Sequence, residues 1–242
     1  MKGVILAGGF GTRLLPLTGV TNKHLLPIYD RPMIFYPIAT LRKSGIDEIL
    51  IVSESSHLEL FSNFLKNGVD HQVSLTYAPQ IGAGGIAEAL KKARDFSKGD
   101  SIAVILGDNI FDDNFEKDVN EFKIGAKIFL KEVSDLKRFG VPVFEKGEIV
   151  KVEEKPENPK SRYAVTGFYL FDKVVFEIIS ELKPSGRGEL EITDALNKYA
   201  EIKKLNYGNI SGFWADAGTF GSLLEASLWA AKGNIHRDVH GD

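Results

Sequence analysis

The sequence of 242 residues contains no cysteine. Disulfide bonds, thiol catalysis and thiolate metal sites are therefore excluded, and cysteine usage gives no information about an oxidising compartment. A strong charge of one sign is missing too, because the formal net charge is −3 with both signs mixed along the chain. Without a general basic field the sequence indicates no nucleic-acid partner, so a bound anion should be small and held by local geometry.

Long apolar runs are also absent. No stretch of about 18 apolar residues occurs, and Met1 is not followed by a basic and then apolar leader. The sequence therefore indicates neither a membrane partner nor secretion, and we expect a cytoplasmic enzyme. Internal repeats, low-complexity segments and a linker rich in Ser, Gly or Pro are missing as well. With 43% hydrophobic residues, the sequence predicts one large catalytic domain over residues 1–242.

Apolar, β-rich runs alternate with helical patterns in the first half of the chain. They cover residues 3–7, 48–52, 73–77 and 102–106, an alternation typical of a parallel sheet covered on both faces. After Gly125, strand-like segments follow at 126–130, 141–144, 148–152 and 163–171, with a hairpin turn at 145–148. The sequence thus predicts an α/β fold, a Rossmann-like three-layer sandwich with a mostly parallel central sheet, helices on both faces and an added strand region. A ligand should bind outside the carboxyl ends of the parallel strands.

The first long helix has recognisable signals at both ends. Asp30 can cap it, Pro32 lies near its first turn, and Gly45 follows its end at Lys43. Ile34, Ile38 and Leu41 are spaced to share one buried face of this helix.

The first apolar run leads directly into a glycine-rich loop, GGFGTR at residues 8–13. Glycines permit positive φ and bring backbone N–H groups close to an anion, while Arg13 and Lys23 add positive charge, so the loop suits a nucleoside triphosphate. A dinucleotide fingerprint would need a third glycine in place of Leu14, and a P-loop would need Gly-Lys-Ser/Thr at residues 11–13. A simple tight turn would explain one or two glycines but not the two cations.

Ten short segments in order along almost the whole chain resemble those of the sugar-1-phosphate nucleotidyltransferases. They are LAGGFGTRL (6–14), PLT (16–18), NKHLLP (22–27), RPMI (31–34), GDN (107–109), RFGV (138–141), EEKP (153–156), VTG (165–167), RGELEITD (187–194) and WADAGT (214–219). The resemblance implies that residues 1–124 bind mainly nucleotide and that 125–232 shape a sugar-phosphate pocket. Residues 233–242 are predicted to form a flexible tail.

The reaction implied by the resemblance is a single in-line displacement. The phosphate oxygen of glucose-1-phosphate attacks the α-phosphorus of dTTP (or UTP), giving dTDP-glucose and pyrophosphate at the head of deoxysugar pathways such as rhamnose synthesis. Phosphate is already a competent nucleophile at neutral pH, so the site need only position the substrates and neutralise charge.

The resemblance also implies a role for individual residues. The catalytic residues would be Arg13, Lys23 and Asp108, with Arg13 on the triphosphate and Lys23 on phosphate near the reacting centre. The nucleotide would be bound by Leu6, Gly8, Gly9, Gly11, Thr12, Arg13, Gln80, Gly85 and Asp108. The sugar phosphate would be bound by Lys23, Gly140, Glu154, Lys155, Thr166, Gly167 and Arg187. Asp108 and Asp216 would hold Mg²⁺, which often takes one or two carboxylates together with phosphates and water.

Base recognition should fall to Gln80 and the loop at 82–85. The Gln80 amide offers a donor beside an acceptor, which complements the N3–H and O4 edge of thymine or uracil. The chain has AGGIAE at 83–88 where the family pattern is PDGLAQ, so an altered loop and base preference stay open.

Several less functional interpretations remain open. Asp108 and, more readily, Asp216 could cap a turn, and residues 153–155 could be a solvated charged turn. Phe213 and Trp214 are predicted to belong to the core, and Glu189 and Glu191 to orient a helix. His236 and His240 have metal-ligand spacing, but a frayed terminus is the preferred interpretation.

At the level of the whole protein, two alternatives are kept. A uridylyltransferase or a hexosamine-1-phosphate user would share the same fold. A non-catalytic regulatory subunit should have lost charged site residues, whereas all of them are present. Longer family members carry a C-terminal helical extension with dimer contacts and an allosteric nucleotide site. The resemblance predicts a short form without this extension, so a homo-oligomer is expected by analogy only.

Overall fold

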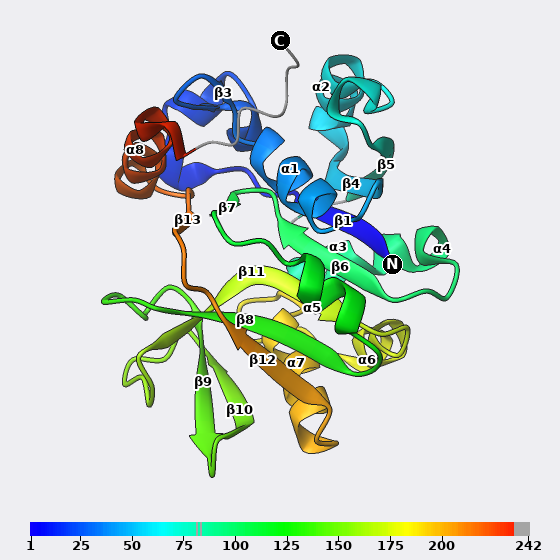
Figure 1. The fold of residues 1–242 in the computed structure, drawn as a ribbon, viewed down its shortest axis with the longest axis vertical. Helices are drawn as coiled ribbons and strands as arrows, with labels where there is room; N and C mark the ends of the chain where they lie inside the picture. Colours follow the sequence, from blue (N-terminus) through cyan, green and yellow to red (C-terminus); the bar gives the residue numbers. More distant parts are fainter. Residues whose placement is uncertain (81, 83, 235–242) are drawn as a thin grey trace.

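The computed structural model describes residues 1–80, 82 and 84–234 of the chain (Figure 1). Its centre is a seven-stranded sheet with the strand order β12-β8-β11-β6-β1-β4-β5. The strands are β1 (Lys2–Ala7), β4 (Glu48–Glu54), β5 (Ser74–Gln80), β6 (Ile102–Leu106), β8 (Ala126–Glu132), β11 (Tyr163–Phe171) and β12 (Leu205–Asn209). Within this sheet β11 is antiparallel to both neighbours and every other pairing is parallel, which confirms the predicted mostly parallel sheet.

Helices cover both faces of the sheet, because successive residues of each buried strand point to opposite sides. Val4 and Leu6 of β1 pack with α3 (Ile86–Leu90), α6 (Val175–Glu181) and α7 (Ile192–Glu201). Ile5 and Ala7 pack on the other face with α1 (Phe35–Lys43), α2 (Ser55–Leu65) and the region of α5 (Glu116–Glu121). The predicted three-layer sandwich is therefore confirmed. A short helix α4 (Arg94–Ser97) precedes β6.

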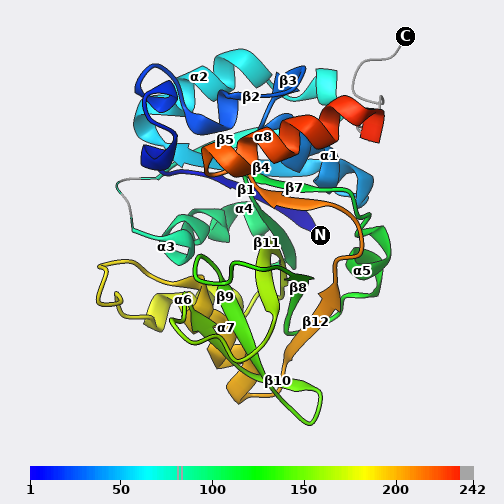
Figure 2. The ribbon, with the colours of Figure 1, turned by 90° about the vertical axis from the view of Figure 1, so that its left-hand side faces the viewer.

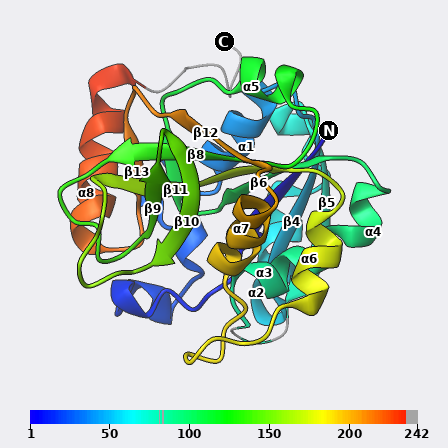
Figure 3. The ribbon, with the colours of Figure 1, turned by 90° about the horizontal axis from the view of Figure 1, so that it is seen from below.

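Three two-stranded sheets lie outside the central one. The hairpin of β9 (Gly140–Glu145) and β10 (Glu148–Glu154) turns at Lys146 and Gly147, both with positive φ, where the sequence predicts a turn. Seen from below, this hairpin projects beside α7 (Figure 3). Strand β7 (Asn109–Phe111) pairs with β13 (Trp214–Asp216), and β2 (Pro27–Ile28) pairs with β3 (Arg31–Pro32). Helix α8 (Phe220–Trp229) follows β13 and crosses the upper half of the molecule (Figure 2).

The predicted start of the first long helix is wrong. The helix begins at Phe35, with Ile34 in the N-cap position, and Asp30 makes no cap. The Asp30 carboxylate instead accepts hydrogen bonds from Arg31 at 3.0 and 3.1 Å, in the turn of the β2–β3 hairpin that also takes in Pro32. Aspartate and proline favour tight turns as much as helix starts, so the local signal was the same for both structures.

The end and the buried face of that helix are confirmed. Gly45 has a φ of +78° just beyond Lys43, and Ile34, Ile38 and Leu41 are at most 1% exposed. Among the described residues, no helix combines the length and the apolar character needed to cross a bilayer. His236, His240 and most of the predicted tail lie outside the described residues, as do Ile81 and Ala83.

Candidate active site

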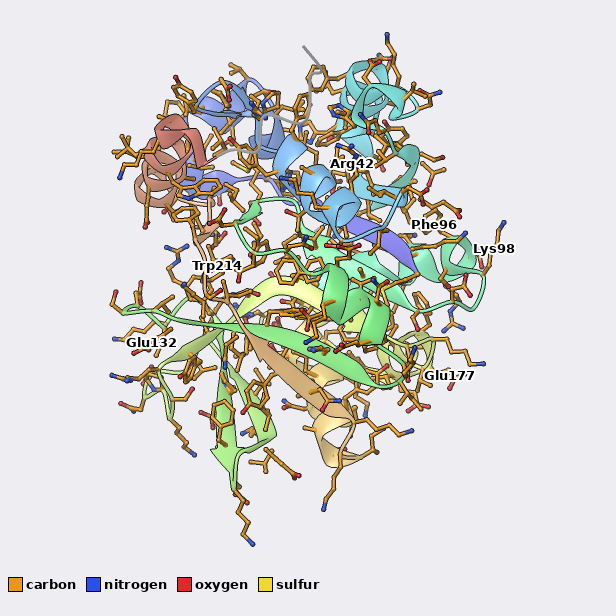
Figure 4. The ribbon with its side chains drawn as sticks, in the orientation of Figure 1. Arg42, Phe96, Lys98, Glu132, Glu177 and Trp214 are labelled. Atoms are coloured by element: carbon orange, nitrogen blue, oxygen red, sulfur yellow. The ribbon has the colours of Figure 1, made fainter. Side chains whose placement is uncertain are left out.

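A cavity of about 610 Å³ opens where the loops that follow β1, β5 and β6 meet the second half of the chain. Trp214, labelled in Figure 4, lies on its wall, on a strand between α8 and the β9–β10 hairpin. The location agrees with the rule that ligands of parallel sheets bind at the carboxyl ends of the strands. Most of the residues predicted for the site line this cavity: Leu6, Gly8, Gly9, Arg13, Lys23, Gln80, Gly85, Asp108, Gly140, Glu154, Lys155, Gly167 and Asp216.

The two predicted metal ligands are brought together by main-chain pairing. Asp108 ends the loop after β6, and the next residue, Asn109, pairs with Asp216 between β7 and β13. The backbone N–H of Ala217 also donates to the carbonyl oxygen of Asp108 at 2.9 Å. Two segments far apart in sequence therefore present both carboxylates to the same cavity.

Each of these carboxylates is paired with a cation. The Lys23 Nζ lies 2.5 Å from Asp108 Oδ2, and Asn109 Nδ2 donates to Asp108 Oδ1 at 3.1 Å. The Arg138 Nη2 lies 2.7 Å from Asp216 Oδ2. Arg138 is a site residue that the sequence analysis missed, since it appears only as part of the RFGV segment.

Burial and the neighbouring charges shift the pKa values of the two carboxylates in opposite directions. Burial raises the pKa of Asp216 to about 6, and the negative charge of Asp108 adds to this rise. Burial alone would raise the pKa of Asp108 as well, but the charge of Lys23 and its hydrogen bond hold it well below the usual range. Asp108 therefore stays ionised at neutral pH, and the two carboxyl groups are close enough to sense each other.

The donor set fits a small divalent cation. In the parts of the chain that the structure describes, no cluster of three or more Asp, Glu, His or Cys side chains could hold a metal. Two carboxylates beside a loop that is predicted to bind phosphate suit Mg²⁺, which commonly takes further ligands from phosphate and water. Asp108 and Asp216 are the residues that would hold it.

The glycine loop is shaped by close packing around Gly11. This residue has a φ of +62°, and a Cβ there would lie 2.8 Å from Thr18 Cγ2 and 3.0 Å from Lys23 Cβ. The Thr18 hydroxyl donates to the Gly11 carbonyl at 2.9 Å. Gly11 thus packs the loop against Lys23, and neither Gly11 nor Thr12 is among the cavity-lining residues.

The Arg13 guanidinium lies against Gly218, beside Asp216. A Cβ on Gly218 would be 2.9 Å from Arg13 Nη2 and 3.1 Å from Asp216 Oδ1. Glycine at this position therefore leaves room for the cation next to the predicted metal ligand. Gly218 belongs to the WADAGT segment, and nothing in the sequence indicates this role for it.

The predicted base-recognition loop is tied to the second half of the chain. Gln80 is buried and donates through Nε2 to the Gly82 carbonyl at 3.1 Å. Leu190 N–H donates to the Gly84 carbonyl at 2.8 Å. Gly85 has a φ of +90°, and a Cβ there would be 2.6 Å from the Leu190 carbonyl oxygen. Only glycine fits this approach of two backbones.

Glu154, which also lines the cavity, is held by three neighbours. Thr193 Oγ1 donates to Glu154 Oε2 at 2.5 Å, and both Lys155 Nζ and Arg187 Nη2 lie 3.3 Å from Glu154 Oε1. Arg187 also donates to Glu191 at 2.8 Å and does not line the cavity. The side chain of Glu191 is used in this ion pair and does not cap α7, whereas Glu189, predicted to orient a helix, lies on the cavity wall.

Of the predicted pair Thr166 and Gly167, only Gly167 lines the cavity. Thr166 is fully buried and its hydroxyl donates to the Phe129 carbonyl on β8 at 2.9 Å, so its side chain is used within the sheet. Gly167 lines the cavity, where a Cβ would collide with the Asn109 amide at 2.6 Å.

Asn109 is a second residue that the sequence analysis missed. Its Oδ1 accepts hydrogen bonds from Gly167 N–H at 2.9 Å and from Trp214 Nε1 at 2.8 Å, while its Nδ2 donates to Asp108. The sequence predicted that Trp214 belongs to the core. Its indole instead forms part of the cavity wall. An Asn directly after Asp108 was the available signal, but its partners lie on distant strands.

His24 lies buried at the same cavity. Asn22 Oδ1 accepts from the His24 backbone N–H at 2.9 Å, so it must also act as the acceptor for His24 Nδ1 at 2.8 Å. Burial and the nearby Lys23 charge lower the pKa of His24 to about 3. The imidazole is therefore neutral and leaves Nε2 as an acceptor.

Fold and site together define an α/β protein whose cavity brings together a glycine loop with cations, paired carboxylates and a second cluster of acidic and basic side chains, a set of groups that suits phosphorylated ligands. The chain belongs to the nucleotidyl transferase family, whose sequence model matches residues 2–233.

Named relatives extend this comparison along nearly the whole chain. The glucose-1-phosphate thymidylyltransferase of Neisseria meningitidis is 42% identical over 247 residues, which cover 99% of this chain and 86% of the relative. That of Xanthomonas campestris is 42% identical over 233 residues, covering 93% and 79%.

Solved structures agree in fold. A Bacillus anthracis protein assigned as a glucose-1-phosphate thymidylyltransferase, in complex with sucrose, superposes with a TM-score of 0.94 at 48% identity and full coverage of both chains. A UDP-glucose pyrophosphorylase complexed with UDP-glucose superposes with a TM-score of 0.84 at 28% identity, covering 96% of this chain and 98% of the other.

Proposed function

We propose that this protein is a glucose-1-phosphate thymidylyltransferase, which makes dTDP-glucose and pyrophosphate from dTTP and glucose-1-phosphate. The observation that carries the proposal is the convergence of Arg13, Lys23, Asp108, Asp216 and the Glu154–Lys155 pair on one cavity. The relatives with 42% identity that bear this name support the choice of nucleotide and sugar.

The nucleotide is bound by the first half of the chain. The backbone of Gly8 and Gly9 and the guanidinium of Arg13 bind the triphosphate, with Gly11 and Thr12 shaping the loop from behind. Gln80 binds the pyrimidine edge, and the Gly85 backbone lies against the ring. Leu6, one residue before the end of β1, forms an apolar wall beside the sugar of the nucleotide.

Asp108 and Asp216 would hold Mg²⁺, which would neutralise charge on the phosphoryl oxygens and polarise the α-phosphate. Lys23 and Arg138, which pair with these carboxylates, would be available to bind phosphate oxygens.

The sugar phosphate is bound from the second half. Glu154 accepts hydrogen bonds from sugar hydroxyls, and its fixed pairing with Thr193 sets the direction of its free lone pairs. Lys155 and Lys23 bind the phosphate, Arg187 joins them by leaving Glu154 and Glu191, and Gly140, Thr166 and Gly167 shape the backbone of the pocket.

The chemical step needs no side-chain nucleophile. A phosphate oxygen of the sugar phosphate forms a bond to the α-phosphorus while the bond from that phosphorus to the bridging oxygen breaks, and pyrophosphate leaves with the electron pair. Arg13 neutralises the charge that develops on the leaving group. No proton has to move, because the attacking oxygen is already ionised.

A uridylyltransferase is the second candidate, favoured by the structural match to a UDP-glucose pyrophosphorylase. Thymine and uracil differ by one methyl group, and a difference of that size in a pocket is worth about 1 to 3 kcal/mol, or roughly 10 to 200-fold. Selectivity between dTTP and UTP should accordingly be partial.

Pyrophosphate release tests the proposal. The assay uses Mg²⁺ and glucose-1-phosphate with dTTP, UTP, CTP, ATP and GTP in parallel, and repeats the series with N-acetylglucosamine-1-phosphate. Turnover dominated by dTTP with glucose-1-phosphate supports it, and a preference for UTP or the amino sugar changes the substrates but keeps the mechanism. No turnover with any pair would contradict the enzymatic function.

A further inference from the structure

Arg138 lines the cavity and forms an ion pair with one of the predicted metal ligands. Its Nη2 lies 2.7 Å from Oδ2 of Asp216, and the side chains are only 32% and 15% exposed. Its Nε is buried and finds no hydrogen-bond partner in the described part of the chain. The guanidinium therefore pairs with the Asp216 carboxylate and keeps one unpaired donor, its Nε–H.

Aromatic packing presents this guanidinium to Asp216. The Arg138 guanidinium lies 5.3 Å from the centre of the Phe139 ring, which packs at 5.2 Å against the ring of Trp214. Trp214 and Asp216 are on the same short strand, β13. The loop that carries Arg138 is thus anchored on the strand that carries the carboxylate, so the ion pair is a built feature of the fold.

Each carboxylate of the proposed metal site has one ion-pair partner, and Arg13 is a further cation beside Asp216. Lys23 pairs with Asp108 at 2.5 Å, as Arg138 pairs with Asp216. A divalent cation that enters alone must displace both positive groups and then remain beside them, which is electrostatically unfavourable in a partly buried site. A triphosphate removes this obstacle, because its anionic oxygens accept the displaced cations.

We propose that Arg138 is an internal counter-ion of Asp216 that competes with the divalent cation, so that metal binds the site together with the nucleotide and only weakly before it. This inference rests on the proposed function, because it takes Asp108 and Asp216 as the metal ligands. The displaced guanidinium, with its free Nε, then binds a phosphate oxygen.

Binding of Mn²⁺ to the full chain, followed by the electron paramagnetic resonance of free Mn²⁺, tests the proposal without any turnover. Measurements are made with Mn²⁺ alone and with a dTTP analogue that has a methylene between the α and β phosphorus atoms. We expect Arg138→Met to bind Mn²⁺ alone at least about fivefold more tightly than the unmodified protein, within the usual range of site coupling. The ratio of the Mn²⁺ affinity with the analogue to the affinity without it should be smaller in Arg138→Met by the same factor.

Three variants separate charge from structure. Arg138→Lys keeps the positive charge and should restore weak binding of Mn²⁺ alone. Arg162→Met removes one positive charge from an exposed ion pair with Glu132, labelled in Figure 4, and should leave Mn²⁺ binding unchanged. If Arg138→Met does not fold by circular dichroism, Arg138→Gln gives the same comparison with a smaller change in shape.

The outcomes distinguish this inference from the proposed function. Equal affinity of Arg138→Met and the unmodified protein for Mn²⁺ alone overturns the counter-ion role. Retention of Mn²⁺ binding by Asp216→Asn, in the presence of the analogue, would instead remove Asp216 from the metal site and overturn that part of the proposed function.

Discussion

The backbone N–H of Ala217 donates a 2.9 Å hydrogen bond to the carbonyl oxygen of Asp108. This bond extends the β7–β13 pairing by one step beyond Asp216. The spacing of the two carboxylates is therefore set by main-chain geometry, which side-chain substitutions at either position leave in place. Variants of these residues should test chemistry more than folding.

Substitution of Asp108 by Asn should abolish most turnover. The change keeps the shape of the side chain but removes the charge that binds the cation and pairs with Lys23. We expect pyrophosphate release to fall at least about 100-fold, as for the loss of other electrostatic groups in active sites. Circular dichroism should be unchanged, and turnover at the normal rate would exclude Asp108 from the metal site.

Stability should fall as the pH is lowered because of His24. Its folded pKa, about 3, is below the ordinary value of 6.5, so the unfolded chain binds more protons between these values. The contribution of His24 to the free energy of unfolding is complete above pH 6.5. It is reduced by about 2 kcal/mol at pH 5, and the reduction continues toward pH 3. Urea denaturation of His24→Gln should show a shallower loss of stability from pH 6.5 to 5, and identical slopes for the two proteins would contradict this.

Asn109 should act as a positioning residue. Asn109→Ala leaves Gly167 N–H and Trp214 Nε1 without their acceptor, and a buried unsatisfied group costs about 1 to 3 kcal/mol. We expect the free energy of unfolding to drop by at least the cost of one unsatisfied group, about 1 to 3 kcal/mol. A purely structural role would lower stability and leave kcat alone, whereas loss of the bond to Asp108 should lower kcat more than it raises the KM for dTTP.

Gly85→Ala should weaken nucleotide binding. Both the φ of +90° and the 2.6 Å approach to the Leu190 carbonyl exclude a Cβ, so the loop must move from Gln80 and the base. We expect the KM for dTTP to rise about tenfold or more. Gly99→Ala is the matched control, because Gly99 has a φ of +83° with nothing within 4 Å of the added Cβ. It should cost about 1 kcal/mol of stability and leave the KM unchanged, and equal effects on the KM would contradict a role for Gly85.

The sequence predicted the layers of the fold well, because apolar runs and alternating burial are local properties. Val4 and Ile5 are neighbours in the chain, and the periodicity of a strand suffices to place them on opposite faces. Asp30 shows the limit of local signals, since aspartate favours both a helix start and a turn, and the pairing of β2 with β3 decided between them.

The sequence placed residues at the cavity only where a motif carries its own geometry. The glycine loop and Asp108 follow directly from buried strands. The contact of Arg138 with Asp216 joins residues 78 positions apart, and the amide of Asn109 meets donors 58 and 105 positions away, so no spacing in the sequence reveals either. Arg187 was predicted to reach phosphate, but its position beside Glu154 and Glu191 depends on folded neighbours.

The antiparallel strand β11 lies between β8 and β6, and so joins the strands of both halves into one continuous sheet. The same strand carries Gly167 to the cavity wall, so the strand that joins the two halves also lines the predicted site. A hinge that opens the two halves would have to break this strand from a neighbour. Movements on ligand binding should therefore be confined to segments outside the central sheet: the glycine loop, the segment with Arg138 and the loop with Arg187.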